Sequence, residues 1–228
     1  MKQINLLLLI LNIVLFNFSY AQEHKIVELR SKYNSLGSFW VFSFEGGMTY
    51  PFTDYQKSLP GYLFRSSIEY FLPSEKFFTS GIRISSYFGE LNGHSNTGRP
   101  AGDGNLKRVI KNFNTPYFSI EPSIVLVFGY KTVIPYLAGG AEYIISFIPL
   151  EDNSYSLFMD SKRSSAFSFI TEFGMRFFIT NKVSYNIALK FNFGKSDELD
   201  GFVSRKKDVF FALSSGLSFH LFRKERLR

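Results

Sequence analysis

Ten ionisable residues could act together, because each falls on the polar side of a segment in which apolar and polar residues alternate. The group consists of five acids, four bases and one histidine: Glu45, Glu69, Glu121, Glu142, Glu172, Arg65, Arg83, Arg176, Lys190 and His220. A nearly balanced set of charges can neutralise itself by pairing, whereas an unpaired charge in a narrow interior costs several kcal/mol. The pattern therefore predicts an internal network of ion pairs.

Candidates for catalysis or metal binding are fewer. The chain has no cysteine, and its three histidines, His24, His94 and His220, are not spaced as metal ligands. His94 precedes Ser95, and a histidine and a serine at a barrel rim could act with an acid in acyl transfer. A solvated loop histidine and a polar interior His220 explain these residues more simply. We therefore expect no catalytic residue, cofactor or metal.

The alternation has a period of two, which is typical of β-strands. Eight segments show it: Phe39–Tyr50, Gly61–Leu72, Phe77–Gly89, Thr115–Gly129, Val133–Phe147, Ser165–Thr180, Val183–Gly194 and Val209–Phe222. Each has one apolar face, which suits lipid, and one face of small or polar residues, which suits a narrow interior. Strand edges cannot stay unpaired in hydrocarbon, so the first and last segments should pair. The prediction is an all-β fold, an eight-stranded antiparallel up-and-down transmembrane β-barrel.

The connections alternate between long and short. The long ones are 51–60, 91–114, 149–164 and 195–207, and the others are tight turns. This asymmetry is typical of outer-membrane barrels, which have short periplasmic turns and longer extracellular loops. The segment 91–114 is rich in glycine and asparagine, which favours turns and mobility over packed structure.

Two local features of the sequence lead to further predictions. A basic extracellular contact surface would be formed by Arg99, Lys107, Arg108 and Lys111. Pro122 cannot donate to a β-ladder, so we expect a bulge or a lost hydrogen bond there.

The ends of the chain suggest export. Residues 1–21 have the pattern of a secretory signal peptide, with Lys2, an apolar run and the cleavage site Ser19-Tyr20-Ala21. Residues 22–38 are expected to be a periplasmic lead-in, residues 39–222 the barrel, and residues 223–228 a basic periplasmic tail.

The amino-acid composition is typical of a protein that contacts a membrane surface. Aromatic residues are 18% of the chain, and the formal net charge is +7. We interpret the basic excess as affinity for anionic headgroups or cell-surface polymers and not for nucleic acid. One aromatic residue per strand is expected in a girdle at the periplasmic side: Trp40, Tyr70, Phe77, Phe128, Tyr136, Phe177, Tyr185 and Phe219.

With these eight segments and the closing stretch VFFALSSGLSFHLF, residues 39–222 resemble the small outer-membrane β-barrel families. These are the transmembrane domain of outer-membrane protein A, the OmpX/Ail group and the PorT-like barrel proteins of Bacteroidota. The resemblance implies insertion by the outer-membrane assembly machinery, which reads a terminal aromatic residue. Phe222 would fill that role, although residues 223–228 follow it.

The expected function is that of a non-enzymatic outer-membrane protein with a lumen filled by side chains. It would be a structural or interaction component, or a subunit of an envelope secretion or assembly complex, either as a monomer or within a hetero-complex. Its partners would be outer-membrane lipid or lipopolysaccharide and an envelope protein. Three alternatives stay open: a lipid-modifying enzyme at the barrel rim, a narrow gated ion pathway, and a soluble carrier with its apolar face turned inward.

Overall fold

The computed structural model describes residues 39–52, 57–72, 78–100, 109–128, 133–149, 161–180, 182–194 and 209–222. The expected signal peptide, lead-in and basic tail therefore lie outside the described residues. Within these ranges, no helix has the length and apolar character needed to cross a membrane.

The described chain forms β-strands that close into a ring. The strands are β1 (Phe39–Phe52), β2 (Lys57–Leu59), β3 (Gly61–Phe71), β4 (Phe78–Pro100), β5 (Val109–Phe128), β6 (Val133–Pro149), β7 (Ser161–Phe178), β8 (Val183–Gly194) and β9 (Val209–Phe222). Each of the eight long strands pairs antiparallel with its neighbours, and β1 pairs with β9 from Phe39↔Phe222 to Phe52↔Val209. The prediction of an eight-stranded antiparallel barrel is confirmed.

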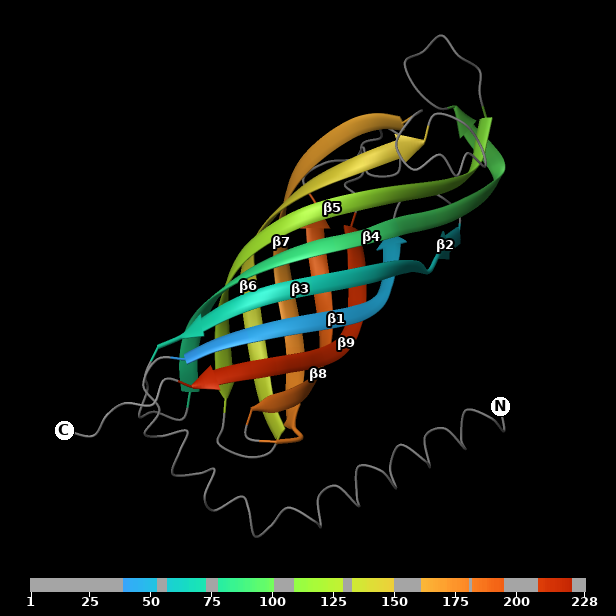
Figure 1. Ribbon diagram of the computed structural model, residues 1–228. Helices are drawn as coiled ribbons and strands as arrows, with labels where there is room; N and C mark the ends of the chain where they lie inside the picture. The colour runs from blue at the N-terminus through green and yellow to red at the C-terminus, as the bar shows by residue number, and fades with distance from the viewer. Residues whose placement is uncertain are drawn as a thin grey trace, which may run out of the picture.

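The two ends of the barrel differ (Figure 1). The start of β1 and the end of β9 lie side by side at one end, here called the terminus end. At the opposite end β4 and β5 run on together beyond the other strands, so this is called the hairpin end. The short strand β2 pairs with β4 there, from Lys57↔His94 to Leu59↔Asn92.

Exposure alternates along every long strand. Apolar side chains such as Ile82, Phe64 and Phe167 are 64%, 61% and 65% exposed on the outer wall, whereas Arg83 is 1% exposed. A continuous apolar wall of this kind suits lipid and not water, because soluble proteins rarely expose large apolar patches. The predicted orientation, with apolar residues outward and charges inward, is confirmed, and it rules out a soluble carrier with an apolar interior.

The prediction of a loop at residues 91–114 is wrong for most of this segment. The β4–β5 ladder continues from Leu91↔Thr115 to His94↔Asn112, shifts register, and pairs again at Arg99↔Ile110. Glycine and asparagine do favour turns, but each new pair extends two strands that are already aligned, so local propensity is overridden. Strand structure also enters two other expected loops, as β2 and as the start of β7 at Ser161.

The expectation for Pro122 is confirmed as a local loss of pairing. The β5–β6 ladder runs through Ile120↔Tyr143 and resumes at Ser123↔Gly140, with no partner for Glu121 or Pro122. The register is the same on both sides, so the ladder is interrupted without a bulge. Proline has no N–H to donate, which accounts for the interruption.

Candidate functional site

The candidate site is the lumen, the interior of the barrel. All ten residues that the sequence singles out lie there, and none is more than 6% exposed. Every long strand contributes at least one of them: Glu45 from β1, Arg65 and Glu69 from β3, Arg83 from β4, Glu121 from β5, Glu142 from β6, Glu172 and Arg176 from β7, Lys190 from β8, and His220 from β9. The period of two explains this placement, because every second side chain of a strand points inward.

Glu172 is the hub of the network. Its Oε1 accepts hydrogen bonds from Arg65 Nη1 at 3.1 Å and Arg83 Nη1 at 2.9 Å, and its Oε2 accepts one from Arg83 Nη2 at 3.0 Å. The Tyr136 hydroxyl donates to Oε1 at 2.8 Å. Arg65 reaches Glu172 from the opposite side of the ring, so this contact joins strands that are not neighbours.

Seven of the charged residues form one continuous chain of alternating sign. In order of contact they are Glu45, Arg65, Glu172, Arg83, Glu121, Lys190 and Glu142. Each neighbouring pair is 2.9 to 3.1 Å apart, and the side chains are at most 4% exposed. We call these residues the ion-pair chain, and an acid stands at each of its two ends.

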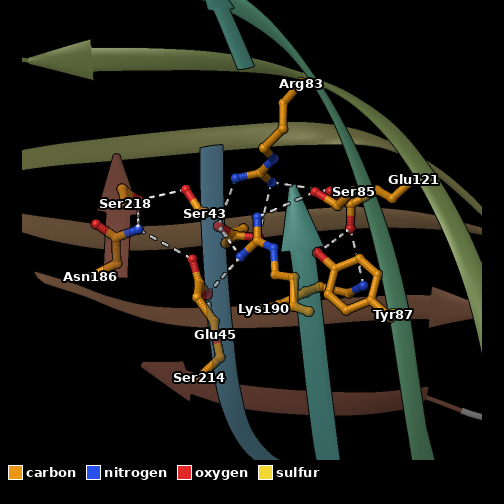
Figure 2. A network of polar contacts seen from close by, with 12 residues as sticks. Ser43, Glu45, Arg83, Ser85, Tyr87, Glu121, Asn186, Lys190, Ser214 and Ser218 are labelled. Carbon is orange, nitrogen blue, oxygen red and sulfur yellow. Dashed lines mark hydrogen bonds and ion pairs between the residues drawn. The ribbon is translucent and has the colours of Figure 1, made fainter. Parts of the chain in front are cut away.

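Neutral groups support the Glu45 end (Figure 2). Ser214 Oγ donates to Glu45 Oε2 at 2.7 Å, and Asn186 Nδ2 donates to Oε1 at 3.3 Å. Asn186 also hydrogen-bonds Ser218, whose hydroxyl lies 2.5 Å from that of Ser43. These contacts join β1, β8 and β9 at the seam where the barrel closes.

Lys190 occupies a cage at the other end. Its Nζ lies 3.0 Å from both Glu121 Oε2 and Glu142 Oε1, and 3.5 Å from the centre of the Tyr87 ring. The Tyr87 hydroxyl donates to Glu121 Oε2 at 2.8 Å (Figure 2). Glu142 also accepts hydrogen bonds from Ser119 and Asn192.

A second ion pair stands beside the ion-pair chain. Arg176 Nη2 donates to both oxygens of Glu69, at 2.6 and 2.5 Å, and its guanidinium lies 4.9 Å from the centre of the Tyr136 ring. Arg83 Nη1 is 4.0 Å from Glu69, which brings the pair next to the ion-pair chain.

Apolar side chains close the lumen above and below these charges. At the hairpin end the buried cluster is Leu63, Tyr87, Leu91, Tyr117, Ile144, Ala166, Phe210 and Ala212. At the terminus end it is Phe39, Val41, Phe71, Val125, Val127, Ile134, Tyr136, Ala138, Phe178 and Ala188. The lumen is therefore layered, with charges in the middle and apolar side chains toward both ends.

Neither His94 nor His220 is placed as the alternative of a lipid-modifying enzyme at the barrel rim would require. His94 is on the β4–β5 hairpin, where its imidazole contacts Asn112. His220 Nε2 is 2.9 Å from Ser184 Oγ, but both residues are inside the lumen, at 1% and 0% exposure. The His220 ring centre lies 4.6 Å from that of Phe178, within the terminus-end cluster and not at the rim.

The structure describes only some of the residues predicted to form the basic surface and the aromatic girdle. The backbones of Arg99 and Lys111 lie in β4 and β5, but their side chains, and all of Lys107 and Arg108, lie outside what the structure describes. The expected girdle position of Tyr136 is wrong, since this residue is 3% exposed and donates to Glu172 in the lumen. Among the described residues, no group of three or more potential ligands could hold a metal ion.

Several lumen residues escaped the sequence analysis. Tyr87, Tyr117 and Phe210 are apolar or aromatic side chains at inward positions, where small or polar residues were expected. The period of two could have identified Tyr87 as an inward residue, because it is separated from Arg83 and Ser85 by an even number of positions along β4. An amphipathic pattern alone does not reveal that the ends of the interior are closed by rings.

The sequence matches no protein-family model, and a search of curated proteins finds no match. Solved structures do match. Neisserial surface protein A is 15% identical with a TM-score of 0.51, covering 80% of this chain and 98% of its own. Ail of Yersinia pestis, in complex with the heparin analogue sucrose octasulfate, is 13% identical with a TM-score of 0.50, covering 82% and 100%.

The outer-membrane enzyme PagL also matches, at 12% identity and a TM-score of 0.41, covering 79% of this chain and 98% of its own. That similarity is too low to bear on catalysis. The chain therefore has the fold of the small eight-stranded outer-membrane β-barrel proteins, and this fold together with the apolar outer wall locates it in the outer membrane.

Proposed function

We propose that the protein is a non-enzymatic structural or interaction component of the outer membrane, which works through its outer surface and its β4–β5 hairpin and not through its lumen. The observation that carries this proposal is the packed interior. The charged side chains of the ion-pair chain are at most 4% exposed and lie in direct contact with one another across the lumen. Eight strands enclose just enough volume for side chains, so this interior stiffens the barrel.

The hairpin supports the choice of an interaction role. A strand needs about 9–11 residues to cross a bilayer, yet β4 has 23 residues and β5 has 20. The extra length continues as a paired ladder beyond the last β5–β6 pair, Tyr117↔Ser146. A paired two-stranded projection presents a surface for a partner in the envelope, and the sequence adds Arg99 and Lys111 to it.

The two other candidate functions are less well supported. Ser184 and His220 form a hydroxyl–imidazole pair, but a lipid substrate has no route to two side chains that are at most 1% exposed. Ion conduction would require the ion-pair chain to break at several points, and each broken buried pair would leave an uncompensated charge.

Cross-linking in intact cells tests the proposal. The variant replaces residues 92–114 by an Asn-Gly turn, which joins β4 and β5 above the membrane. We expect the shortened barrel to insert and to keep its heat-modifiable gel mobility, but to lose cross-linked envelope proteins that the parent retains.

The matched control keeps the projection and replaces only two of its asparagines by another small polar residue. Asn112→Ser and Asn114→Ser keep the ladder, so the cross-linked proteins should persist. Recovery of the same proteins with the shortened hairpin would contradict an interaction role for it. Stepwise currents from the purified parent in planar bilayers would contradict the packed interior.

A further inference from the structure

We propose that the folded barrel binds one proton in its lumen, on the carboxyl group of Glu142. This goes beyond the proposed function, because it concerns the interior and not the hairpin. The argument begins with a count. Among the described residues, the lumen holds five carboxylates, Glu45, Glu69, Glu121, Glu142 and Glu172, but only four lysine or arginine side chains.

The topology of the contacts shows where the surplus lies. Glu69 is matched by Arg176, which donates to both of its oxygens, while Arg83 lies farther away, at 4.0 Å. The remaining residues form the ion-pair chain, which begins with Glu45 and ends with Glu142. A chain of alternating charges with an acid at both ends has one carboxylate too many, so full ionisation would leave a net negative charge in a closed interior. A buried net charge is strongly unfavourable, and a bound proton removes it.

The acids inside the ion-pair chain are poor sites for that proton. Glu172 contacts two arginines, and Glu121 contacts Arg83 and Lys190. Protonating either would leave its cations undercompensated. His220, the other titratable group of the lumen, lies among Ser184, Phe39 and Phe178 and not against the ion-pair chain. The proton therefore belongs at one of the two ends.

The two ends have different surroundings. Glu45 is 6% exposed and contacts Arg65, whose guanidinium stays charged.

Glu142, at the other end of the ion-pair chain, is fully buried and faces Lys190, which it shares with Glu121. Its other contacts are neutral: Ser119 of β5 and Asn192 of β8. Two further ionisable groups lie around this site: Tyr87 of β4, whose ring lies against Lys190, and the buried Tyr117 of β5, which interacts electrostatically with Glu142 and Glu121. Glu45 likewise accepts hydrogen bonds from two neutral groups, Ser214 and Asn186, so these donors do not distinguish the two ends. Deeper burial, together with a lysine shared with Glu121 in place of an arginine, makes Glu142 the end that keeps the proton.

Infrared spectroscopy tests the assignment, because a neutral carboxylic acid has a carbonyl stretch separate from that of a carboxylate. We expect this band in the parent barrel at neutral pH and its loss in Glu142→Gln. The matched pair Glu142→Asp and Glu45→Asp keeps the number of acids, so only the first should shift the band. The proposal is overturned if the parent lacks the band, if Glu142→Gln keeps it, or if Glu45→Asp shifts it instead.

Proton linkage gives a second readout. A glutamate in an unfolded chain is ionised above about pH 4.3, so unfolding the parent would release the proton. The unfolding equilibrium constant of the parent, divided by that of Glu142→Gln, should rise about tenfold per pH unit between about pH 5.5 and 7.5. The other titrating groups are the same in both proteins, so their contributions to the pH dependence cancel in this ratio. A ratio that does not change with pH overturns the proposal, as does failure of this neutral, isosteric variant to fold.

Discussion

At the scale of single residues, the lumen is built from charges that depend on one another across the barrel. Glu172 accepts hydrogen bonds from Arg65, Arg83 and Tyr136, which come from three other strands. In a buried site, a charge that loses its partner costs far more than the pair contributes. The hub is therefore the point at which one substitution should disturb the whole interior.

Glu172→Gln should lower the free energy of unfolding by about 3–5 kcal/mol, because it leaves two buried guanidinium groups undercompensated. Urea unfolding in lipid vesicles, followed by the fluorescence of the single tryptophan, Trp40, measures the loss. The control Glu90→Gln removes a carboxylate that hydrogen-bonds Asn92 outside the lumen, and should change stability by about 0.5 kcal/mol or less. Equal effects of the two substitutions would contradict a central role for Glu172.

Close packing around Gly174 leads to a second prediction for a single residue. A Cβ atom on Gly174 would lie only 2.2 Å from Cζ of Tyr136. Gly174→Ala should therefore push the Tyr136 ring away from Glu172 and cost about 1–3 kcal/mol of unfolding free energy. Gly139 is the control, since its added Cβ would have Ile170 O as its nearest neighbour, at 3.8 Å.

Unfolding of both alanine variants in the same vesicles separates the two sites. A loss in Gly174→Ala with little change in Gly139→Ala is the expected result. Tyr136→Leu should restore part of the loss in Gly174→Ala, because a smaller side chain leaves room for the new methyl group. No recovery in the double variant would mean that the ring is not what the methyl group meets.

At the scale of strands, length and pairing differ around the ring. The β4–β5 ladder is the longest and passes through a register shift between His94 and Arg99. The β5–β6 ladder is interrupted at Glu121 and Pro122. The second feature follows from one residue type, because proline cannot donate a main-chain hydrogen bond.

Pro122→Val should restore the missing donor and pair β5 with β6 without a gap. Valine suits a strand, and position 122 faces outward, so its side chain would meet lipid. We expect a gain of about 0.5–1.5 kcal/mol in the free energy of unfolding, and slower hydrogen exchange at Ala141 and Glu142. Ile124→Val is the control, because Ile124 already pairs with Gly139. Unchanged exchange in Pro122→Val would show that proline is not the cause of the interruption.

At the scale of the whole molecule, closure and the apolar wall define a membrane protein. The pairing of β1 with β9 leaves no open edge between the first and last strands of the ring. Lipid can then surround the barrel without meeting unpaired main-chain groups, which hydrocarbon does not tolerate.

Leu137→Arg tests the wall directly. Leu137 faces outward between Leu126 and Phe173 on the neighbouring strands. A charge there should cost about 2–4 kcal/mol and reduce insertion, measured by membrane fractionation and heat-modifiable mobility. Ile179→Arg, at the terminus end, should cost only about 0–1 kcal/mol, since the cost falls toward the interface. Normal insertion of Leu137→Arg would contradict contact with lipid at this position.

The sequence by itself determined the class of fold and the two faces of each strand. A period of two places Glu45, Arg65 and Glu172 on the inner face whatever their partners, because successive side chains of a strand point to opposite sides. The same pattern, with edges that must be paired in hydrocarbon, required a closed ring.

Only the tertiary structure decided which charges meet. Arg65 and Glu172 are 107 positions apart and lie on strands from opposite sides of the ring, so their contact depends on how every intervening ladder is aligned. The continuation of β4 and β5 through 91–100 and 109–114 was also beyond the sequence, because local turn propensity there is overridden by extension of an aligned ladder. Side-chain direction is a local property of a strand, whereas the meeting of two side chains is a property of the closed barrel.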